Sequence, residues 1–282
     1  MNTVFVNGEL IDRDKAKVDI EDRGYQFGDG IYEVIRVYGG NTFTMKEHME
    51  RLYQSAEKMK LSIPYEEGDF TSKLLHLIDL NGVRDGIVYV QVTRGVSARQ
   101  HHFPREDVVG SVVAYTKDFP VPALQMQEGV TAKLVEDIRW LRCDIKSLNL
   151  LGNLLAKQEA ASMGHFEAIL HRGETVTEGS SSNAFMVKNG VIYTHPVTNL
   201  ILNGITRRVI EELCRKNGLS FQEETFSVSE LMKAEEVFIA STTSEVMPVV
   251  EIDGQEIGEG TPGAVTKRLQ ELFNERKGME AR

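Results

Sequence analysis

Two glycine-containing dipeptides, each set between apolar segments, constrain the fold of this chain more than any other local feature. Asn7-Gly8 lies within TVFVNGEL, and Gly39-Gly40 lies within IYEVIRVYGGNTFTM. Such dipeptides form tight turns between antiparallel strands, because glycine and asparagine tolerate the positive φ angles that these turns require. The sequence therefore predicts that the chain opens with two β-hairpins.

Helical spacing of apolar residues begins after the second hairpin. Residues 46–61 form an amphipathic pattern, and residues 70–82 indicate a second helix. The apolar positions of the first pattern are Met45, Met49, Leu52, Ala56 and Met59. Strand-like segments follow at 86–95 and 108–116.

The second half of the chain alternates strand-like and helix-like segments. Strands are predicted at 130–137, 166–173, 183–195 and 235–242, and helices near 148–163, 204–217 and 262–277. Together with the hairpins, this order predicts an α/β protein of the α+β type, with mixed sheets and flanking helices, and not a doubly wound parallel sheet.

The segment KDFPVPALQMQEG suits a connector, because Pro120 and Pro122 each fix φ and lack an N–H. We therefore predict a smaller N-terminal domain at 1–118, a linker at 119–123 and a larger C-terminal domain at 124–282. Gly28-Asp29-Gly30 resembles the start of a dinucleotide-binding fingerprint, but no apolar strand precedes it and no third glycine follows. A tight turn is the better interpretation.

Charge and cysteine content exclude several classes of function. The 282 residues carry a formal net charge of −10, which disfavours a nucleic-acid or anionic-membrane partner. Cys143 and Cys214 form no metal-binding or disulfide spacing, and no stretch approaches the length of a membrane span. These features predict a cytoplasmic protein with reduced thiols.

Four local features have residue types that suit chemistry. Lys146 lies among Ile145, Leu148, Leu150 and Leu151, which would desolvate its amine and lower its pKa, as Schiff-base chemistry requires. Residues 175–185 are either a polar loop or a carboxylate, Glu178, beside hydroxyls that suit an anion.

The other two features are possible phosphate sites. Ile205 and Thr206 begin a predicted helix, where unsatisfied N–H groups favour an anion, although plain helix capping is the simpler alternative. Ser241, Thr242 and Thr243 end an apolar strand, where hydroxyls can bind phosphate oxygens or simply form a polar turn.

Six segments in order resemble the class IV aminotransferases, the two-domain fold-type-IV pyridoxal-phosphate enzymes, and within them the D-amino-acid branch. They are DRGYQFGDGIYE (22–33), HMERL (48–52), DIKSLN (144–149), VTEGSSSN (176–183), LNGITR (202–207) and the STT triplet at 241–243. The resemblance covers almost the whole chain. It places the cofactor lysine in the predicted C-terminal domain.

The resemblance implies that pyridoxal 5'-phosphate is the cofactor and that Lys146 is the catalytic residue, bound to it as a Schiff base. Glu178 would pair with the pyridinium nitrogen, and Leu202 would pack against the ring. The implied phosphate contacts are Arg51, Ile205, Thr206 and Thr242.

The stretch TRGVSARQHHFP bears on the substrate. Strand alternation would put Arg99 and His101 on one face and His102 on the other. The Arg-x-His pair resembles the carboxylate-binding site of the D-amino-acid enzymes, with Tyr32 as a third member. The resemblance also implies a homodimer, with Arg99 and His101 reaching the neighbouring subunit's site. A polar loop is the alternative, and a metal site is disfavoured because adjacent strand residues diverge.

The implied activity is transfer of the amino group of D-alanine or similar D-amino acids to 2-oxoglutarate, giving pyruvate and D-glutamate. Two enzymatic alternatives share the cofactor residues: a branched-chain L-amino-acid aminotransferase and an aminodeoxychorismate lyase. A non-catalytic cofactor-binding protein or interaction module is a further alternative, but a binder has no need of the Lys146 and Glu178 pair.

Overall fold

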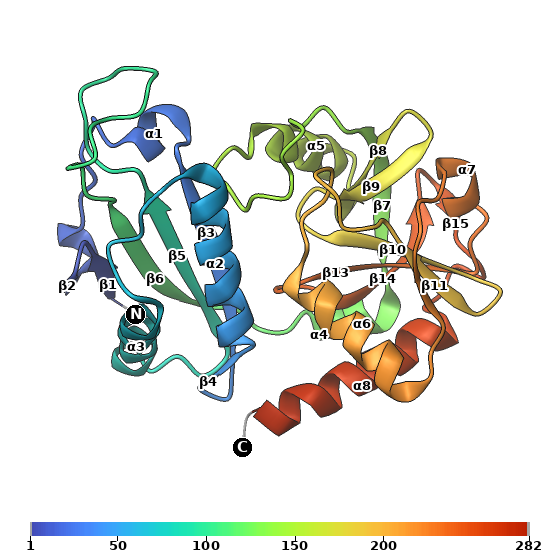
Figure 1. The fold of residues 1–282 in the computed structure, drawn as a ribbon. Helices are drawn as coiled ribbons and strands as arrows, with labels where there is room; N and C mark the ends of the chain where they lie inside the picture. The colour runs from blue at the N-terminus through green and yellow to red at the C-terminus, as the bar shows by residue number, and fades with distance from the viewer. Residues whose placement is uncertain (1, 281–282) are drawn as a thin grey trace. The chain divides into compact units, whose positions relative to one another are not determined.

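The computed structural model of the protein describes residues 2–280 and contains two compact units (Figure 1). The first unit comprises residues up to Pro120 together with Ile145–Asn149. The second comprises Val121–Asp144 and Leu150–Met279. Each unit has its own sheet and its own apolar core.

The first unit is built on a six-stranded antiparallel sheet with the strand order β2-β1-β6-β5-β3-β4. Its strands are β1 (Thr3–Val6), β2 (Glu9–Asp12), β3 (Gly30–Tyr38), β4 (Asn41–Phe43), β5 (Gly86–Thr93) and β6 (Val112–Asp118). Its helices are α1 (Arg23–Phe27), α2 (Met45–Met59) and α3 (Glu67–Leu80), and a 3-10 turn spans Arg13–Lys15.

Helices α2 and α3 share a core with one face of this sheet. Leu52 of α2 and Leu74 of α3 are buried with Ile35 and Val90, which lie on the inward face of β3 and β5. Alternate residues of a strand point to opposite faces. The other face of β3 therefore presents Tyr32, which lies three residues before Ile35.

Both predicted hairpins are confirmed. Asn7 and Gly8 have φ values of 48° and 100° between β1 and β2, and Gly39 and Gly40 have φ values of 55° and 91° between β3 and β4. Positive φ at both turn positions is the conformation that fits the twist of a two-residue hairpin. The two predicted helices are confirmed as α2 and α3, although α3 begins three residues earlier than expected.

The turn at residues 28–30 is also confirmed. Gly28 caps α1 in the left-handed region at φ 66°, and β3 starts at Gly30. Between them the buried carboxylate of Asp29 accepts hydrogen bonds from Arg23 Nε and Arg94 Nε, each at 2.8 Å. A helix and an antiparallel strand flank this turn, which confirms that it is not part of a dinucleotide-binding unit.

The second unit is built on a nine-stranded mixed sheet with the order β12-β11-β10-β13-β14-β7-β8-β9, and β15 pairs with β14. Its strands are β7 (Val130–Glu136), β8 (Glu167–Arg172), β9 (Thr175–Gly179), β10 (Asn183–Lys188), β11 (Val191–Thr194), β12 (Phe221–Glu223), β13 (Glu236–Ser241), β14 (Glu245–Ile252) and β15 (Gln255–Glu256). Its helices are α4 (Ala123–Glu128), α5 (Leu151–Ser162), α6 (Ile205–Asn217), α7 (Val228–Leu231) and α8 (Ala264–Glu280).

Parallel pairs occur at β7/β8, β7/β14 and β11/β12, and the other neighbours are antiparallel. The predicted class, mixed sheets with flanking helices, is confirmed by this topology. The expected connector contains the short helix α4, and the strand predicted at 108–116 begins only at Val112. Residues 175–179 form the strand β9 and not a loop, because they pair with β8 and are mostly buried.

The segment Ile145–Asn149 packs with the first unit, although it lies within the C-terminal domain predicted at 124–282. Its backbone pairs with the start of β3: Tyr32 N–H donates to the Lys146 carbonyl at 3.1 Å, and Leu148 N–H donates to the Gly30 carbonyl at 2.9 Å. Such long-range pairing has no local sequence signal. The division at 1–118 and 124–282 stays a prediction.

Candidate active site

Lys146 is held by its backbone beside β3. In addition to the two hydrogen bonds with the start of that strand, Lys146 N–H donates to Ser55 Oγ at 3.4 Å. The side chain is half-buried, and Nζ lies 4.2 Å from the centroid of the Tyr32 ring. The aromatic face holds the amine by a cation–π contact while the main chain is fixed by hydrogen bonds.

The apolar environment predicted for this lysine is only partly present. Ile145 is buried and Leu148 is half-buried, but Leu151 is 70% exposed and cannot remove water from the amine. Tyr32 supplies the apolar contact instead. Its ring stacks on Tyr89 with centroids 5.8 Å apart.

Arg51 lies on the inward side of the first unit, where it binds a buried carboxylate. Its Nε donates to Glu33 Oε1 at 2.6 Å and its Nη2 donates to Glu33 Oε2 at 2.9 Å, while His48 Nδ1 lies 2.7 Å from the same Oε2. Burial alone would raise the pKa of Glu33, but Arg51 and His48 outweigh it and hold that pKa well below its usual range. Burial lowers the pKa of His48, which favours its neutral form. The guanidinium of Arg51 is thus oriented by Glu33.

Glu178 lies at the end of β9 with both oxygens engaged. Oε1 accepts from Arg139 Nη1 at 2.6 Å, and Oε2 accepts from Asn183 Nδ2 and from the Leu202 N–H, each at 3.0 Å. Burial raises the pKa of Glu178 to about 7, against the opposing effect of Arg139. Arg139 is itself fixed by Asp137, whose carboxylate oxygens accept from Nε and Nη2, each at 2.9 Å.

The predicted phosphate residues of the second unit lie at two chain turns. Ile205 and Thr206 are buried at the start of α6, which has no side-chain N-cap hydrogen bond in the described chain. Thr242 is half-buried in the turn between β13 and β14. Gly204 is required before α6, because an added Cβ would lie 2.1 Å from Asn183 Oδ1. N–H groups at a helix start favour an anion.

The serines after Glu178 bind an internal carboxylate, so the expectation that they are available to an external anion is wrong. Ser181 Oγ and Ser182 Oγ donate to Glu167 Oε2 at 3.1 and 3.0 Å, and Ser180 Oγ donates to Glu167 Oε1. Glu167 is buried, and Ser180–Ser182 turn the chain from β9 into β10. Their role is therefore to satisfy a buried charge and fix the end of β9.

Arg99 and His101 lie in an irregular loop after β5, so the strand alternation expected at 99–102 is wrong. Both side chains are exposed and both contact Phe27: the Arg99 guanidinium carbon is 4.7 Å and the His101 ring centre 5.8 Å from its ring. Between them the Gln100 carbonyl accepts from Arg23 Nη1 at 2.7 Å. The structure thus brings Arg99 and His101 together by way of Phe27, and not by the pleat of a strand.

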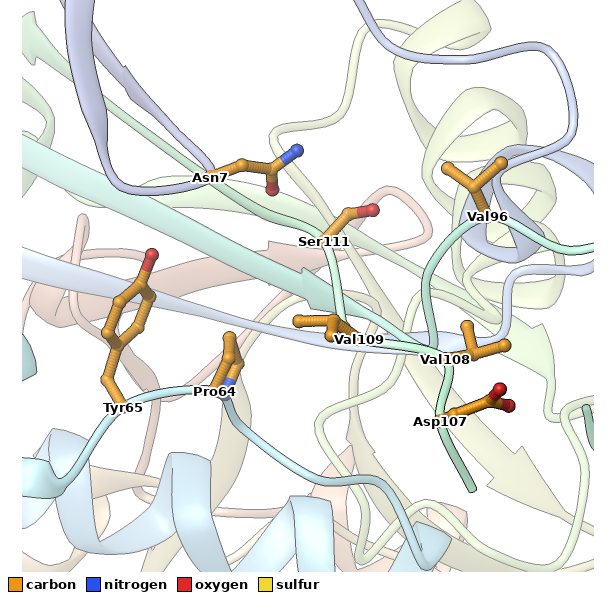
Figure 2. A pocket seen from close by; sticks show the side chains of 9 residues that line it. Asn7, Pro64, Tyr65, Val96, Asp107, Val108, Val109 and Ser111 are labelled. Atoms are coloured by element: carbon orange, nitrogen blue, oxygen red, sulfur yellow. The ribbon is translucent and has the colours of Figure 1, made fainter. Parts of the chain in front are cut away.

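Two cavities of the first unit are lined by none of the predicted site residues. One, of about 530 Å³, is lined by Asn7, Tyr65, Val96 and Asp107 among others (Figure 2). The other, of about 540 Å³, shares Asn7 and Val96. Neither contains the groups that the predicted chemistry needs.

Sequence reasoning missed Glu33, His48, Asp137, Arg139 and Asn183. Only Glu33 had a usable signal, because a charged residue at an inward position of an otherwise apolar strand requires a buried partner. Arg139 and Asn183 contact Glu178 through the fold of the second unit, which no local pattern encodes.

Within residues 2–280, no group of three or more His, Cys, Asp or Glu side chains is arranged to hold a metal ion. The same range contains no helix long and apolar enough to cross a membrane.

The chain belongs to the amino-transferase class IV family, whose family model matches residues 30–252. A D-alanine aminotransferase of Staphylococcus haemolyticus is 52% identical over 274 residues, which cover 97% of each chain. Among solved structures, an Escherichia coli branched-chain amino acid aminotransferase superposes with a TM-score of 0.93 at 28% identity, covering 97% of this chain and 94% of that one. The PLP-bound branched-chain amino acid aminotransferase of Thermobaculum terrenum has a TM-score of 0.86 at 26% identity, covering 97% and 93%.

Proposed function

We propose that this protein is a D-amino-acid transaminase that transfers the amino group of D-alanine or a similar D-amino acid to 2-oxoglutarate, giving pyruvate and D-glutamate. The observation that carries the proposal is the fixed, half-buried amine of Lys146 above Tyr32. The 52% identity to a D-alanine aminotransferase over nearly the full chain selects the substrate class.

The residues present fit pyridoxal 5'-phosphate, the cofactor of class IV aminotransferases. The cofactor needs an amine for its aldehyde, a carboxylate for its ring nitrogen and donors for its phosphate. Lys146 supplies the amine, and Glu178, whose pKa is about 7, supplies a carboxyl that ionises readily beside a cation. Arg51 and the N–H groups of Ile205 and Thr206, with the Thr242 hydroxyl, supply the donors.

When bound, the cofactor supplies an electron sink for the pair of electrons released at the substrate Cα. Lys146 Nζ would hold the cofactor through its aldehyde group and would accept and return the proton of the substrate Cα. Glu178 would keep the ring nitrogen protonated, and Arg139 orients Glu178 for that role through the 2.6 Å hydrogen bond. Leu202 would pack against the ring, and its N–H anchors Glu178.

Tyr32, Arg99 and His101 bind the substrate carboxylate and thereby set the stereochemistry. Lysine delivers protons from one side only, so the orientation of the carboxylate decides which enantiomer presents its Cα hydrogen to Nζ. A hydrogen bond to a charged group contributes about 1.5–3 kcal/mol, which corresponds to roughly tenfold to hundredfold discrimination.

We further propose that the protein works as a cytoplasmic homodimer in which Arg99 and His101 act in the partner's site. An apolar stripe on α5 supports this: Leu151, Leu154 and Leu155 are exposed at helical spacing, and Ile138 and Trp140 in the segment after β7 are exposed as well. Exposed apolar side chains gathered in this way mark interaction surfaces. Sedimentation equilibrium tests the dimer, and a monomer at micromolar concentration would contradict it.

Because the fold is similar to that of branched-chain amino acid aminotransferases, one alternative function remains, that of an aminotransferase specific for L-amino acids. The decisive assay supplies D-alanine and L-alanine separately with 2-oxoglutarate and measures pyruvate. We expect reaction with the D form and little with the L form, and the reverse ranking rejects the proposal. In a separate assay, pyruvate release from a chorismate-derived amine without an oxo-acid acceptor would indicate an aminodeoxychorismate lyase instead.

Covalent trapping tests the role of Lys146 directly. Borohydride reduction of the protein with pyridoxal 5'-phosphate should label position 146, and Lys146→Ala should lose the label and the transamination. Lys233→Ala, which removes an exposed lysine of the second unit, is the matched control and should keep both. Labelling at another lysine would overturn the assignment.

A further inference from the structure

Arg36 of β3 is a buried cation for which residues 2–280 provide no acceptor. Its side chain is 1% exposed, and within residues 2–280 none of its three guanidinium nitrogens has a hydrogen-bond partner. The other buried arginines of the first unit, Arg23, Arg51 and Arg94, each form an ion pair with a buried carboxylate. A guanidinium cannot lose its proton in a protein, so burial without an anion is unfavourable.

The surroundings of Arg36 are apolar or aromatic. Its cross-strand neighbours are Phe43 on β4 and Ile87 on β5. The guanidinium carbon lies 4.9 Å from the centroid of the Tyr38 ring and 5.4 Å from that of Phe119. Aromatic faces cover the plane of a guanidinium but leave its N–H groups, which lie in that plane, without acceptors.

Arg36 shares a face of β3 with the reacting amine. Residues 32, 34 and 36 point to the same side of the strand, opposite to Glu33 and Ile35. Lys146 Nζ lies over Tyr32 on that side. Four residues of strand span about 13 Å, and the guanidinium lies toward the end of β3, beside Tyr38 and Phe119, so it must turn back along the strand to approach a substrate at Nζ.

We infer that Arg36 binds the second carboxylate of dicarboxylic substrates, the one remote from the reacting carbon. The inference rests on the proposed function, in which 2-oxoglutarate and D-glutamate carry that group. Arginine binds a carboxylate through two parallel N–H···O hydrogen bonds, which are stronger than its contacts with the two rings. To bind the carboxylate, the Arg36 side chain leaves the Tyr38 and Phe119 rings by rotation about its flexible bonds. D-Alanine and pyruvate lack the second carboxylate and do not use Arg36.

The test compares a one-carboxylate and a two-carboxylate donor in single turnovers of the holoenzyme. Arg36→Met keeps the length and removes the charge, and Arg84→Met removes an exposed arginine of the same unit as a control. For Arg36→Met we expect the rate constant over Kd for D-glutamate to fall by at least about tenfold to hundredfold, because one charge-assisted hydrogen bond contributes that much and the carboxylate loses two. The value for D-alanine should equal that of the wild type, and Arg84→Met should change neither.

A binding measurement separates this role from a structural one. Glutarate and butyrate carry two and one carboxylates and neither reacts, so the thermal shift of the holoenzyme reports binding alone. We expect glutarate to raise the Tm of the wild type more than butyrate does, and Arg36→Met to abolish that difference. If Arg36→Met does not fold, Arg36→Lys replaces it and should retain a reduced preference for glutarate, because lysine is a point charge without the bidentate geometry.

The outcomes distinguish this inference from the proposed function. Equal losses for D-alanine and D-glutamate, or no loss for D-glutamate, overturn the role of Arg36 while transamination stands. A wild type that reacts with neither D-amino acid overturns the proposed function, and glutarate then still reports whether Arg36 binds a second carboxylate.

Discussion

Glu178 should make the stability of the cofactor-free protein decrease as the pH rises from about 4.5 to about 7. Burial raises the pKa of this carboxyl from 4.5 to about 7, although Arg139 partly offsets the effect. A shift of that size corresponds to roughly 3 kcal/mol, and no solvent screening reduces it because Glu178 is buried.

The sign follows from proton linkage. The folded protein holds the Glu178 proton more tightly than the unfolded chain, so the contribution to stability is complete below pH 4.5. It is lost progressively as the pH rises through about 7. A carboxylate whose pKa is depressed, such as Asp137 at about 2, has the opposite dependence.

The assay is urea unfolding of the cofactor-free wild type and of Glu178→Gln from about pH 4.5 to about pH 8.5. The amide does not titrate, so the free-energy difference between the two proteins isolates Glu178. We expect the wild type to lose up to about 3 kcal/mol relative to the variant across this range. Glu57→Gln, on the exposed side of α2, controls for the removal of a carboxyl group.

A difference that does not vary with pH would refute this reasoning, as would a wild type that gains on the variant as the pH rises. Either result would mean that the Arg139 ion pair outweighs burial and that Glu178 is ionised throughout.

Two further substitutions test the loop that contains Arg99 and the buried ion pairs of Asp29. Asp29→Asn should lower the free energy of unfolding by about 3–5 kcal/mol, because it leaves Arg23 and Arg94 buried without their shared anion, and urea unfolding measures this loss. Arg99→Met should lower kcat/KM for D-alanine by about tenfold to hundredfold while the far-UV circular dichroism stays that of the wild type, since the side chain is exposed. Unchanged kinetics would remove Arg99 from the carboxylate site.

The elements that sequence reasoning predicted well have causes that are local. Asn7-Gly8 and Gly39-Gly40 form turns because their own φ preferences select them, and α2 follows from the spacing of Met49, Leu52 and Ala56. Family membership was predicted from six ordered segments and is confirmed.

The elements that were missed depend on contacts far along the chain. Residues 175–179 have a polar composition that suits a loop, yet pairing with β8 makes them a buried strand. Strand alternation was predicted for residues 99–102, but these residues form a loop beyond Gly95, which has a φ of 97°. Its conformation depends instead on Arg23, which binds the Gln100 carbonyl.

The residues of the candidate site also fall into two groups, those with a sequence signal and those that depend on distant contacts. The family segments pointed to Lys146 and Glu178, whose roles stay predictions until the trapping and kinetic experiments are done. The groups that orient them, such as Arg139, come from segments without a motif. Arg36 is an ordinary strand residue in the sequence, and only its environment of Tyr38 and Phe119 makes it unusual.

The pairing of residues 146–148 with β3 has a consequence for recombining this protein with its relatives. A chimera joined at Pro120 would take the lysine from one parent and Tyr32 from the other, so the two residues in cation–π contact would be inherited separately. An active chimera that exchanges the two units needs three crossover points. Ile145–Asn149 then comes from the same parent as the sheet to which it is hydrogen-bonded.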